Sequence, residues 1–171
     1  DLNVTPDVLI PRVDTEVLVS HAISAFRGKS NRPRVMDLCC GSGCIGCAIG
    51  KQLPNSRIVM VDLSDKALRV ARSNVMKCTL GARVACMKAD VFQDPPAHIG
   101  TFDLIVSNPP YIRSQDVLSL DPSVREYEPT EALDGGEDGY DFYEVILEKW
   151  KSCLRPGGYL MFEVGEDQAA H

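Results

Sequence analysis

The stretch that decides the fold is VMDLCCGSGCIGCAIG, residues 35–50. Its apolar start predicts a strand that ends near Asp37, and residues 45–53 predict a helix. Gly41 and Gly43 lie between them, where glycine lets the backbone approach a ligand and aims the NH groups of a helix N-terminus at it. This stretch therefore predicts the first strand, turn and helix of an α/β fold.

The rest of the chain repeats the alternation of apolar strands and amphipathic helices, which indicates βαβ units. We expect one α/β domain over residues 1–171, with a mostly parallel, Rossmann-like sheet and helices on both faces. The fifth strand is expected at a sheet edge, and the chain stops where a helix begins, which suggests a fragment. The predicted strands are residues 35–38, 58–61, 84–87, 104–106 and 159–164, and the predicted helices are residues 15–26, 45–53, 65–78 (capped by Ser64) and 140–154.

Composition and charge restrict the class of protein. The chain has 171 residues, 44% of them apolar, and a formal net charge of −6, which disfavours broad binding to nucleic acid. No apolar run approaches the roughly 18 to 20 residues of a membrane span, and the polar start lacks the pattern of a signal peptide. Seven cysteines, an odd number, fit a reducing compartment. We expect a monomer of the cytoplasm or an organelle matrix, with no membrane segment.

The glycine turn predicts a nucleoside cofactor. Gly41, Gly43 and Gly46 satisfy the pattern G-x-G-x-x-G, and Asp62 ends the second strand about twenty residues later, where a carboxylate can accept both ribose hydroxyls. The alternative interpretation is a tight strand-to-helix turn without a ligand.

Asp90 follows the third strand, at the level where such sheets meet the base of the cofactor. Its carboxylate can accept a hydrogen bond from an exocyclic amine, with Val91 or Phe92 against the ring. A solvated loop aspartate is the alternative.

Four cysteines, Cys39, Cys40, Cys44 and Cys47, crowd the glycine turn. A C-x-x-C pair can bind zinc, but no second pair and no nearby histidine completes a set of four ligands. We therefore expect buried thiols and no metal site.

The most informative stretch is FDLIVSNPPYI, residues 102–112, in which Asn108, Pro109, Pro110 and Tyr111 follow the fourth strand directly. The prolines restrict the backbone and hold Asn108 in an extended pose. The Asn108 side chain and the Pro109 carbonyl can grip a planar NH₂ group, and Tyr111 can cover its π-face. A rigid turn at the end of a strand would explain the prolines but neither Asn108 nor Tyr111.

These residues resemble the class I S-adenosylmethionine-dependent methyltransferases that methylate planar amino or amide nitrogens. More narrowly, LIPRVDTEVLV, NPPYI, YEPTEALDGGEDGYDFY and GGYLMFEVGEDQ resemble the release-factor glutamine methyltransferases, the HemK/PrmC family. The resemblance implies methylation of the side-chain amide of the glutamine in the Gly-Gly-Gln motif of class I peptide-chain release factors. It also implies S-adenosylmethionine as cofactor, with S-adenosylhomocysteine as product.

The resemblance assigns roles residue by residue. The substrate amide would contact Asn108, Pro109, Pro110 and Tyr111, of which Asn108, Pro109 and Tyr111 would carry catalysis. The expected cofactor contacts are Thr15, Asp37, Cys39, Cys40, Gly41, Ser42, Gly43, Asp62, Asp90, Val91 and Asn108.

Two departures from the family accompany the resemblance. Family members usually have Gly-Thr in place of Cys39 and Cys40, and they have a helical domain before this region and two further strands after it. We therefore expect that the chain is a catalytic core without the last strands of the sheet.

Three alternatives stay open at this point. Methylation of adenine or guanine in nucleic acid would use the same grip, but residues 113–141 carry nine acidic and two basic residues, a local charge of −7 that repels phosphate. A nicotinamide-dependent oxidoreductase would satisfy the glycine pattern but leaves residues 108–111 unexplained. The third alternative is a non-catalytic, methyltransferase-like scaffold that binds protein.

Overall fold

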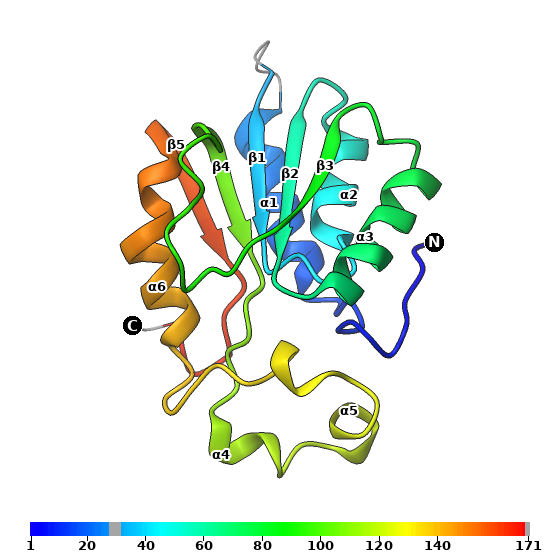
Figure 1. The fold of residues 1–171 in the computed structure, drawn as a ribbon, viewed down its shortest axis with the longest axis vertical. Coiled ribbons are helices and arrows are strands. Elements are labelled where there is room, and N and C mark those ends of the chain that lie inside the picture. Colours follow the sequence, from blue (N-terminus) through cyan, green and yellow to red (C-terminus); the bar gives the residue numbers. More distant parts are fainter. Residues whose placement is uncertain (28–31, 170–171) are drawn as a thin grey trace.

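The computed structural model describes residues 1–27 and 32–169 and contains a five-stranded sheet (Figure 1). The strand order is β3-β2-β1-β4-β5, and every neighbouring pair is parallel. The predicted parallel sheet with β5 at its edge is thus confirmed. The strands are β1 (Arg34–Leu38), β2 (Arg57–Asp62), β3 (Val84–Lys88), β4 (Phe102–Ser107) and β5 (Leu154–Phe162).

The bounds predicted for the last strand are wrong at both ends. β5 already pairs with β4 at Leu154, and an irregularity follows before Tyr159 pairs with Leu104. Pro156 has no backbone NH and Gly157 has a φ of +76°, so the sequence there indicates a turn although the strand continues past it.

The helices confirm the predicted pattern. Ser64 caps α3 as expected, because its side-chain oxygen accepts a hydrogen bond from the NH of Ala67 at 3.3 Å. The helix predicted for residues 140–154 is wrong at its end, since α6 continues only as a 3₁₀ turn before β5. The main helices are α1 (Thr15–Phe26), α2 (Cys44–Gln52), α3 (Asp65–Lys77) and α6 (Asp141–Lys149), followed by the 3₁₀ helix η2 (Trp150–Cys153).

Helices cover both faces of the sheet, as predicted (Figure 1). One apolar core joins α1, α2 and α3 to the sheet through side chains such as Leu18, Ile49 and Leu68. The other core joins α6 and η2 to the opposite face through Ile146 and Trp150. Burial of these two faces stabilises the domain and leaves the carboxyl ends of the strands free for a site.

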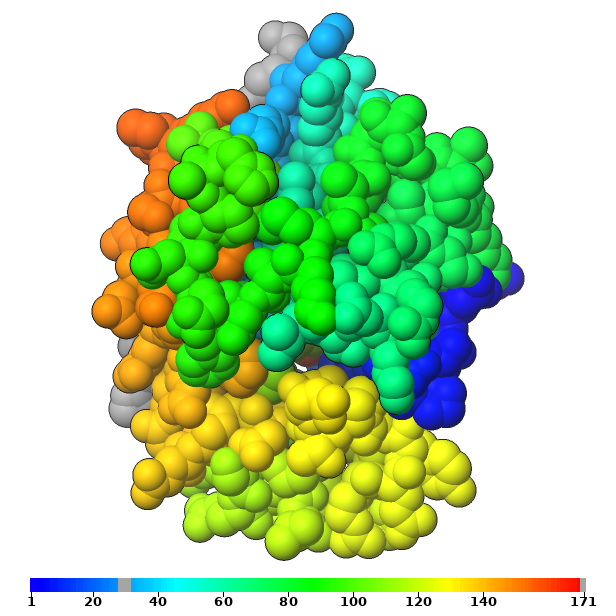
Figure 2. Space-filling view, in the orientation of Figure 1, coloured from blue at the N-terminus to red at the C-terminus, as the bar shows by residue number. Residues whose placement is uncertain are grey.

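Residues 113–139 form a lobe beyond the carboxyl ends of the strands, which we call the carboxyl-edge lobe (Figures 1 and 2). The lobe contains only short helical turns. Figure 2 shows a hollow between this lobe and the body of the domain. The turns are α4 (Ser114–Val117), α5 (Pro122–Arg125) and the 3₁₀ helix η1 (Thr130–Ala132).

Among residues 1–27 and 32–169, no helix is both long enough and apolar enough to span a bilayer.

Candidate active site

Five polar residues follow the five strands at one edge of the sheet. In the order of the strands they are Asp90, Asp62, Cys39, Asn108 and Glu163. From β1 the chain continues to β2 and β3 on one side of the sheet and then crosses to β4 on the other side of β1. The direction in which strands are added therefore reverses between β1 and β4, and this position is the switch point of the sheet. The structure places Asn108 across this switch point from the glycine turn, and ligands of open parallel sheets bind there.

Asp62 holds the glycine turn from the neighbouring strand. Its two carboxylate oxygens accept hydrogen bonds from the NH of Gly41 at 2.8 Å and from the NH of Ser64 at 2.9 Å. Burial raises the pKa of Asp62, while these NH groups lower it. Each oxygen keeps a free lone pair, and a Cβ added to Gly41 would meet nothing within 4 Å. The turn and Asp62 therefore border open space that suits a sugar with adjacent hydroxyls.

Cys39 adopts a backbone conformation that favours glycine. Its φ is +55°, and apart from Thr79 no other non-glycine residue in the described chain has a positive φ. Burial and the charge of Asp62 raise the pKa of the Cys39 thiol, with smaller effects from Ser107 and Asp90. The thiol is thus neutral at physiological pH and lies among the groups at the strand ends.

Asp37 lies behind the turn and is completely buried. Its Oδ2 accepts the NH of Gly46 at 2.9 Å, and its Oδ1 has no partner among the described residues. Burial, with a smaller contribution from the charge of Asp62, raises the pKa of Asp37 to about 7, although the NH of Gly46 opposes this rise. A Cβ on Gly46 would collide with the side chain of Met60. This third glycine of the pattern therefore allows α2 to pack closely against β2.

The side-chain amide of Asn74 is bonded to the glycine turn. This residue was not among the predicted site residues. Asn74 on α3 is fully buried and donates to the carbonyls of Ser42 and Asn3, both at 2.9 Å. It also accepts the NH of Asn3 at 2.6 Å. An asparagine on the apolar face of a predicted helix was the signal for this role.

The NPPY segment is held in place by glycines of the carboxyl-edge lobe and by a glutamine near the chain end. A Cβ on Gly135 would lie 2.6 Å from the Cα of Tyr111, and a Cβ on Gly139 would lie 2.5 Å from its carbonyl oxygen. Gln168 donates its amide to the carbonyls of Tyr111 at 3.2 Å and Gly139 at 3.1 Å. Only glycine fits at these two positions, so the DGGEDG stretch packs directly against the backbone of Pro110 and Tyr111.

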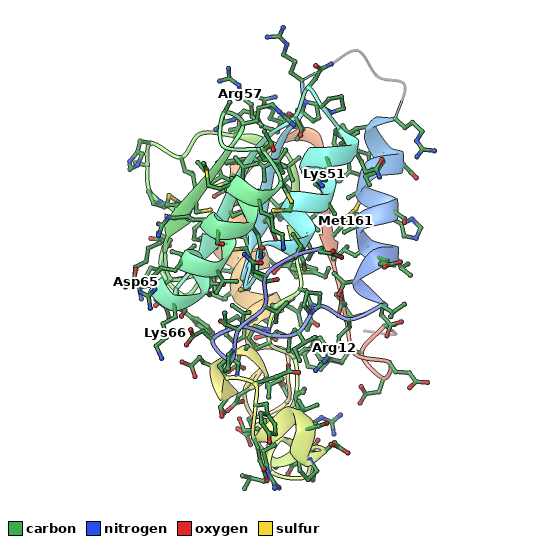
Figure 3. The ribbon with its side chains drawn as sticks, turned by 90° about the vertical axis from the view of Figure 1, so that its right-hand side faces the viewer. Arg12, Lys51, Arg57, Asp65, Lys66 and Met161 are labelled. Atoms are coloured by element: carbon green, nitrogen blue, oxygen red, sulfur yellow. The ribbon has the colours of Figure 1, made fainter. Side chains whose placement is uncertain are left out.

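An ion pair between the partly exposed Arg12 and a buried carboxylate attaches the lobe to the segment before α1. Arg12, which Figure 3 shows close to the lobe, donates to Glu128 at 2.7 Å. The Glu128 side chain is 1% exposed, and its Oε2 has no partner within the described chain. Arg12 thus connects the segment before α1 to the lobe, and Glu128 is a partner that the sequence did not indicate.

Thr15 and Glu163 complete the site on the side of β5. The buried hydroxyl of Thr15, the first residue of α1, donates to Glu163 Oε2 at 2.6 Å. Tyr111 lies near both Glu163 and Arg12. Burial and the Glu163 carboxylate raise the Tyr111 pKa, whereas Arg12 lowers it. Glu163 was not among the predicted site residues.

At the far end of the site, Asp90 lies in a tight turn. Its Oδ1 accepts the NH of Phe92 at 2.9 Å. Val91 is buried, and its carbonyl accepts the indole NH of Trp150 at 2.9 Å. Phe92 is 39% exposed and packs edge-on against Phe142, so this ring is the apolar surface next to Asp90.

The thiols near the turn form no metal site. In the part of the chain that the structure describes, no group of three or more histidine, cysteine, aspartate or glutamate side chains is placed to hold a metal ion. All seven cysteines are free.

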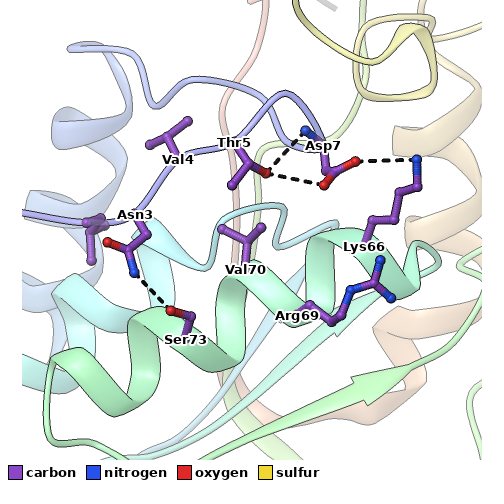
Figure 4. Close-up of a pocket in the computed structure, with 9 residues that line it drawn as sticks. Asn3, Val4, Thr5, Asp7, Lys66, Arg69, Val70 and Ser73 are labelled. Carbon is purple, nitrogen blue, oxygen red and sulfur yellow. Dashed lines mark hydrogen bonds and ion pairs between the residues drawn. The ribbon is translucent and has the colours of Figure 1, made fainter.

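A separate cavity of about 690 Å³ lies between the N-terminal segment and α3 (Figure 4). Asn3 contacts Ser73, and Asp7 contacts Lys66, across it. None of the predicted site residues lines this cavity, so it is distinct from the strand-end site.

Comparison with known protein families identifies the class of protein. Residues 12–121 match the family model described as "Methyltransferase small domain", and the chain belongs to this family. Residues 85–164 also match the model described as "Eco57I restriction-modification methylase". Among solved structures, the hMettl16 catalytic domain in complex with a hairpin is similar, with a TM-score of 0.69 at 19% identity over 91% of this chain and 59% of that chain.

Curated relatives narrow the comparison. The "Release factor glutamine methyltransferase" of Geobacter sulfurreducens is 48% identical over 99% of this chain and 57% of the relative. The protein of that name from Clostridium botulinum is 42% identical over 98% of this chain and 59% of the relative. The predicted class I S-adenosylmethionine-dependent methyltransferase fold and the predicted resemblance to release-factor glutamine methyltransferases are confirmed. The chain spans less than two thirds of the length of these relatives.

Proposed function

We propose that the protein transfers a methyl group from S-adenosylmethionine to the side-chain amide nitrogen of the glutamine in the Gly-Gly-Gln motif of class I release factors. The observation that carries this proposal is the position of Asn108–Tyr111, held rigidly at the end of β4 and beside the glycine turn of β1. The names of the relatives support a release factor as the substrate, because these relatives match nearly the whole of this chain.

The described residues fit the cofactor. Asp62 has free lone pairs for the ribose hydroxyls, Gly41 borders open space for the chain of the methionine, and Asp90 with Phe92 offers an acceptor and an apolar ring to the adenine. When bound, S-adenosylmethionine supplies a methyl group on a positively charged sulfur. A site lined by carboxylates suits this positive charge.

Asn108 and Pro109 orient the acceptor. An amide nitrogen is a poor nucleophile because its lone pair is delocalised, so the site has to align that lone pair with the methyl group. Asn108 Oδ1 and the Pro109 carbonyl accept the two NH bonds of the glutamine amide and so fix its plane. Alignment of this kind contributes up to about 7 to 11 kcal/mol toward lowering the barrier.

The same two acceptors stabilise the positive charge that grows on the amide as the new bond forms. The proton that the nitrogen loses becomes more acidic during transfer and leaves to solvent, so no strong base is required. Tyr111 stays a neutral phenol, because burial raises its pKa, and it excludes water from one face of the amide.

The test is methyl transfer to a purified release factor with S-adenosylmethionine, read by mass spectrometry of the Gly-Gly-Gln peptide. We expect one methyl group on that glutamine and none on a factor with alanine in its place. Asn108→Ala should lose most turnover while binding S-adenosylhomocysteine with unchanged affinity in calorimetry. Turnover within about threefold of the parent would contradict the assigned role.

Methylation of a nucleic-acid base is a second candidate, because the match to the restriction-modification methylase model includes residues 108–111. The acidic carboxyl-edge lobe opposes it, since that charge repels phosphate. Offering RNA and DNA as acceptors in the same assay separates the two. Binding of NAD instead of S-adenosylhomocysteine would indicate an oxidoreductase, and binding of neither would indicate a scaffold.

A further inference from the structure

Glu163 is the acidic group at the strand ends to which the proposed reaction assigns no role. Its NH donates to the carbonyl of Ser107 at 3.0 Å, one residue beyond the pair formed by Ser107 and Phe162. It therefore lies beside Asn108 at the end of the neighbouring strand.

Both the backbone and the side chain of Glu163 are fixed. The hydroxyl of Tyr143 donates to the Glu163 carbonyl at 3.0 Å, and the buried hydroxyl of Thr15 donates to Oε2 at 2.6 Å. The other carboxylate oxygen, Oε1, makes no hydrogen bond within residues 1–27 and 32–169. Fixed in this way, the carboxylate can present one free oxygen to a ligand without losing side-chain entropy.

Glu163 follows β5, on the far side of Asn108 from the glycine turn, and its charge acts on both segments. Its charge contributes to raising the pKa of Cys44, the first residue of α2, and that of Tyr111, although burial is the larger cause for both. The Glu163 charge therefore acts both on the start of α2 and on the acceptor side of the site.

The carboxylate has no positively charged partner in the described chain. Lysine and arginine side chains form seven ion pairs there, and none of these includes Glu163. Arg12, the cation whose charge acts on Tyr111, is bonded to Glu128. A half-buried carboxylate without a counter-charge is unfavourable, so this position suits a cation that arrives with a ligand.

We infer that Glu163 binds the ammonium group of the methionine part of the cofactor, and that Thr15 is a positioning residue that orients its carboxylate. The inference rests on the proposed function, because it requires that cofactor. The glutamine amide, the other reactant, is neutral and gives a carboxylate no counter-charge. An ammonium bound by Glu163 takes the methionine chain from the glycine turn across the end of β4, next to Asn108.

Calorimetry with two ligands tests this assignment. S-adenosylhomocysteine carries the ammonium, whereas 5′-methylthioadenosine keeps the adenine, ribose and thioether but lacks the amino-acid part. For Glu163→Gln we expect the affinity for S-adenosylhomocysteine to fall by about tenfold or more, the scale of one charge-assisted hydrogen bond. The affinity for 5′-methylthioadenosine should stay within about twofold.

Matched variants separate this role from general damage. Glu166→Gln removes an exposed carboxylate three residues further along and should leave both affinities unchanged. Thr15→Val should weaken only S-adenosylhomocysteine binding, and Thr15→Ser, which keeps the hydroxyl, should restore it. Thermal unfolding of each variant checks that the domain is folded.

The outcomes are distinct. An unchanged S-adenosylhomocysteine affinity in Glu163→Gln, or an equal loss for both ligands in a folded variant, overturns the inference and leaves the proposed function standing. So does a variant that keeps this affinity and instead has a raised KM for the release factor, since Glu163 would then face the acceptor. If the parent chain binds neither ligand, the proposed function fails and the inference fails with it.

Discussion

The left-handed backbone of Cys39 allows a prediction about both stability and ligand binding. With a φ of +55°, the Cβ of Cys39 lies close to the following carbonyl, which costs about 1 to 2 kcal/mol relative to glycine. Glycine gains more freedom in the unfolded chain, which offsets about 0.4 to 1 kcal/mol of that relief. We therefore expect Cys39→Gly to stabilise the domain by about 0.5 to 1 kcal/mol.

Thermal and urea unfolding measure this change, which corresponds to a rise of roughly 1 to 4 °C in Tm for a domain of this size. Thr79→Gly is the matched control, since Thr79 has a φ of +60° and is exposed at the end of α3, away from the site. Cys39→Ala separates the thiol from the backbone, because alanine keeps the Cβ and so keeps the strain.

Ligand binding provides the second measurement. The Cys39 thiol lies among Asp62, Asp90 and Ser107, where we propose that the cofactor binds. Because Cys39→Gly removes this side chain and lets the backbone approach the cofactor, we expect it to bind S-adenosylhomocysteine more tightly. Thr79→Gly should not change this affinity. The reasoning is refuted if Thr79→Gly stabilises the domain and Cys39→Gly destabilises it by more than about 1 kcal/mol. In that case packing of the thiol outweighs the backbone strain.

Two further predictions concern buried carboxylates. Burial raises the pKa of Asp37 from 3.8 to about 7, so between these values the folded chain binds a proton that the unfolded chain has lost. The free energy of unfolding should therefore fall as pH rises through this range, by up to about 1.4 kcal/mol per pH unit, and urea titrations of Asp37→Asn should show a flatter dependence. Arg12→Met leaves the Glu128 carboxylate buried without its partner and should lower the unfolding free energy by up to about 3 kcal/mol. The double variant Arg12→Met/Glu128→Met should recover most of this loss in the same urea titration, and equal stability of the single and double variants would contradict the explanation.

Local signals in the sequence were sufficient to predict the sheet and which polar residues gather at its carboxyl edge. Residues close in sequence determine the strand, turn and helix around Gly41. The carboxyl ends of parallel strands then necessarily meet at one edge of the sheet. The position of Asn108 beside the turn therefore followed once the fourth strand was placed next to the first. The start of β5 did not follow, because a proline and a glycine within a strand have the same local signal as a turn.

Glu163 and Glu128, which sequence reasoning missed, act through contacts between distant segments. Thr15 and Glu163 are 148 residues apart, and Arg12 and Glu128 are 116 apart. No periodicity links such pairs, so only the fold reveals that each buried or half-buried carboxylate has one specific partner. Sequence patterns thus indicate candidate ligand-binding groups, whereas the charges that the fold leaves unbalanced are visible only in three dimensions. The unbalanced charge of Glu163 is of this kind, and for that reason it indicates the chemistry of a ligand more directly than the motif beside it.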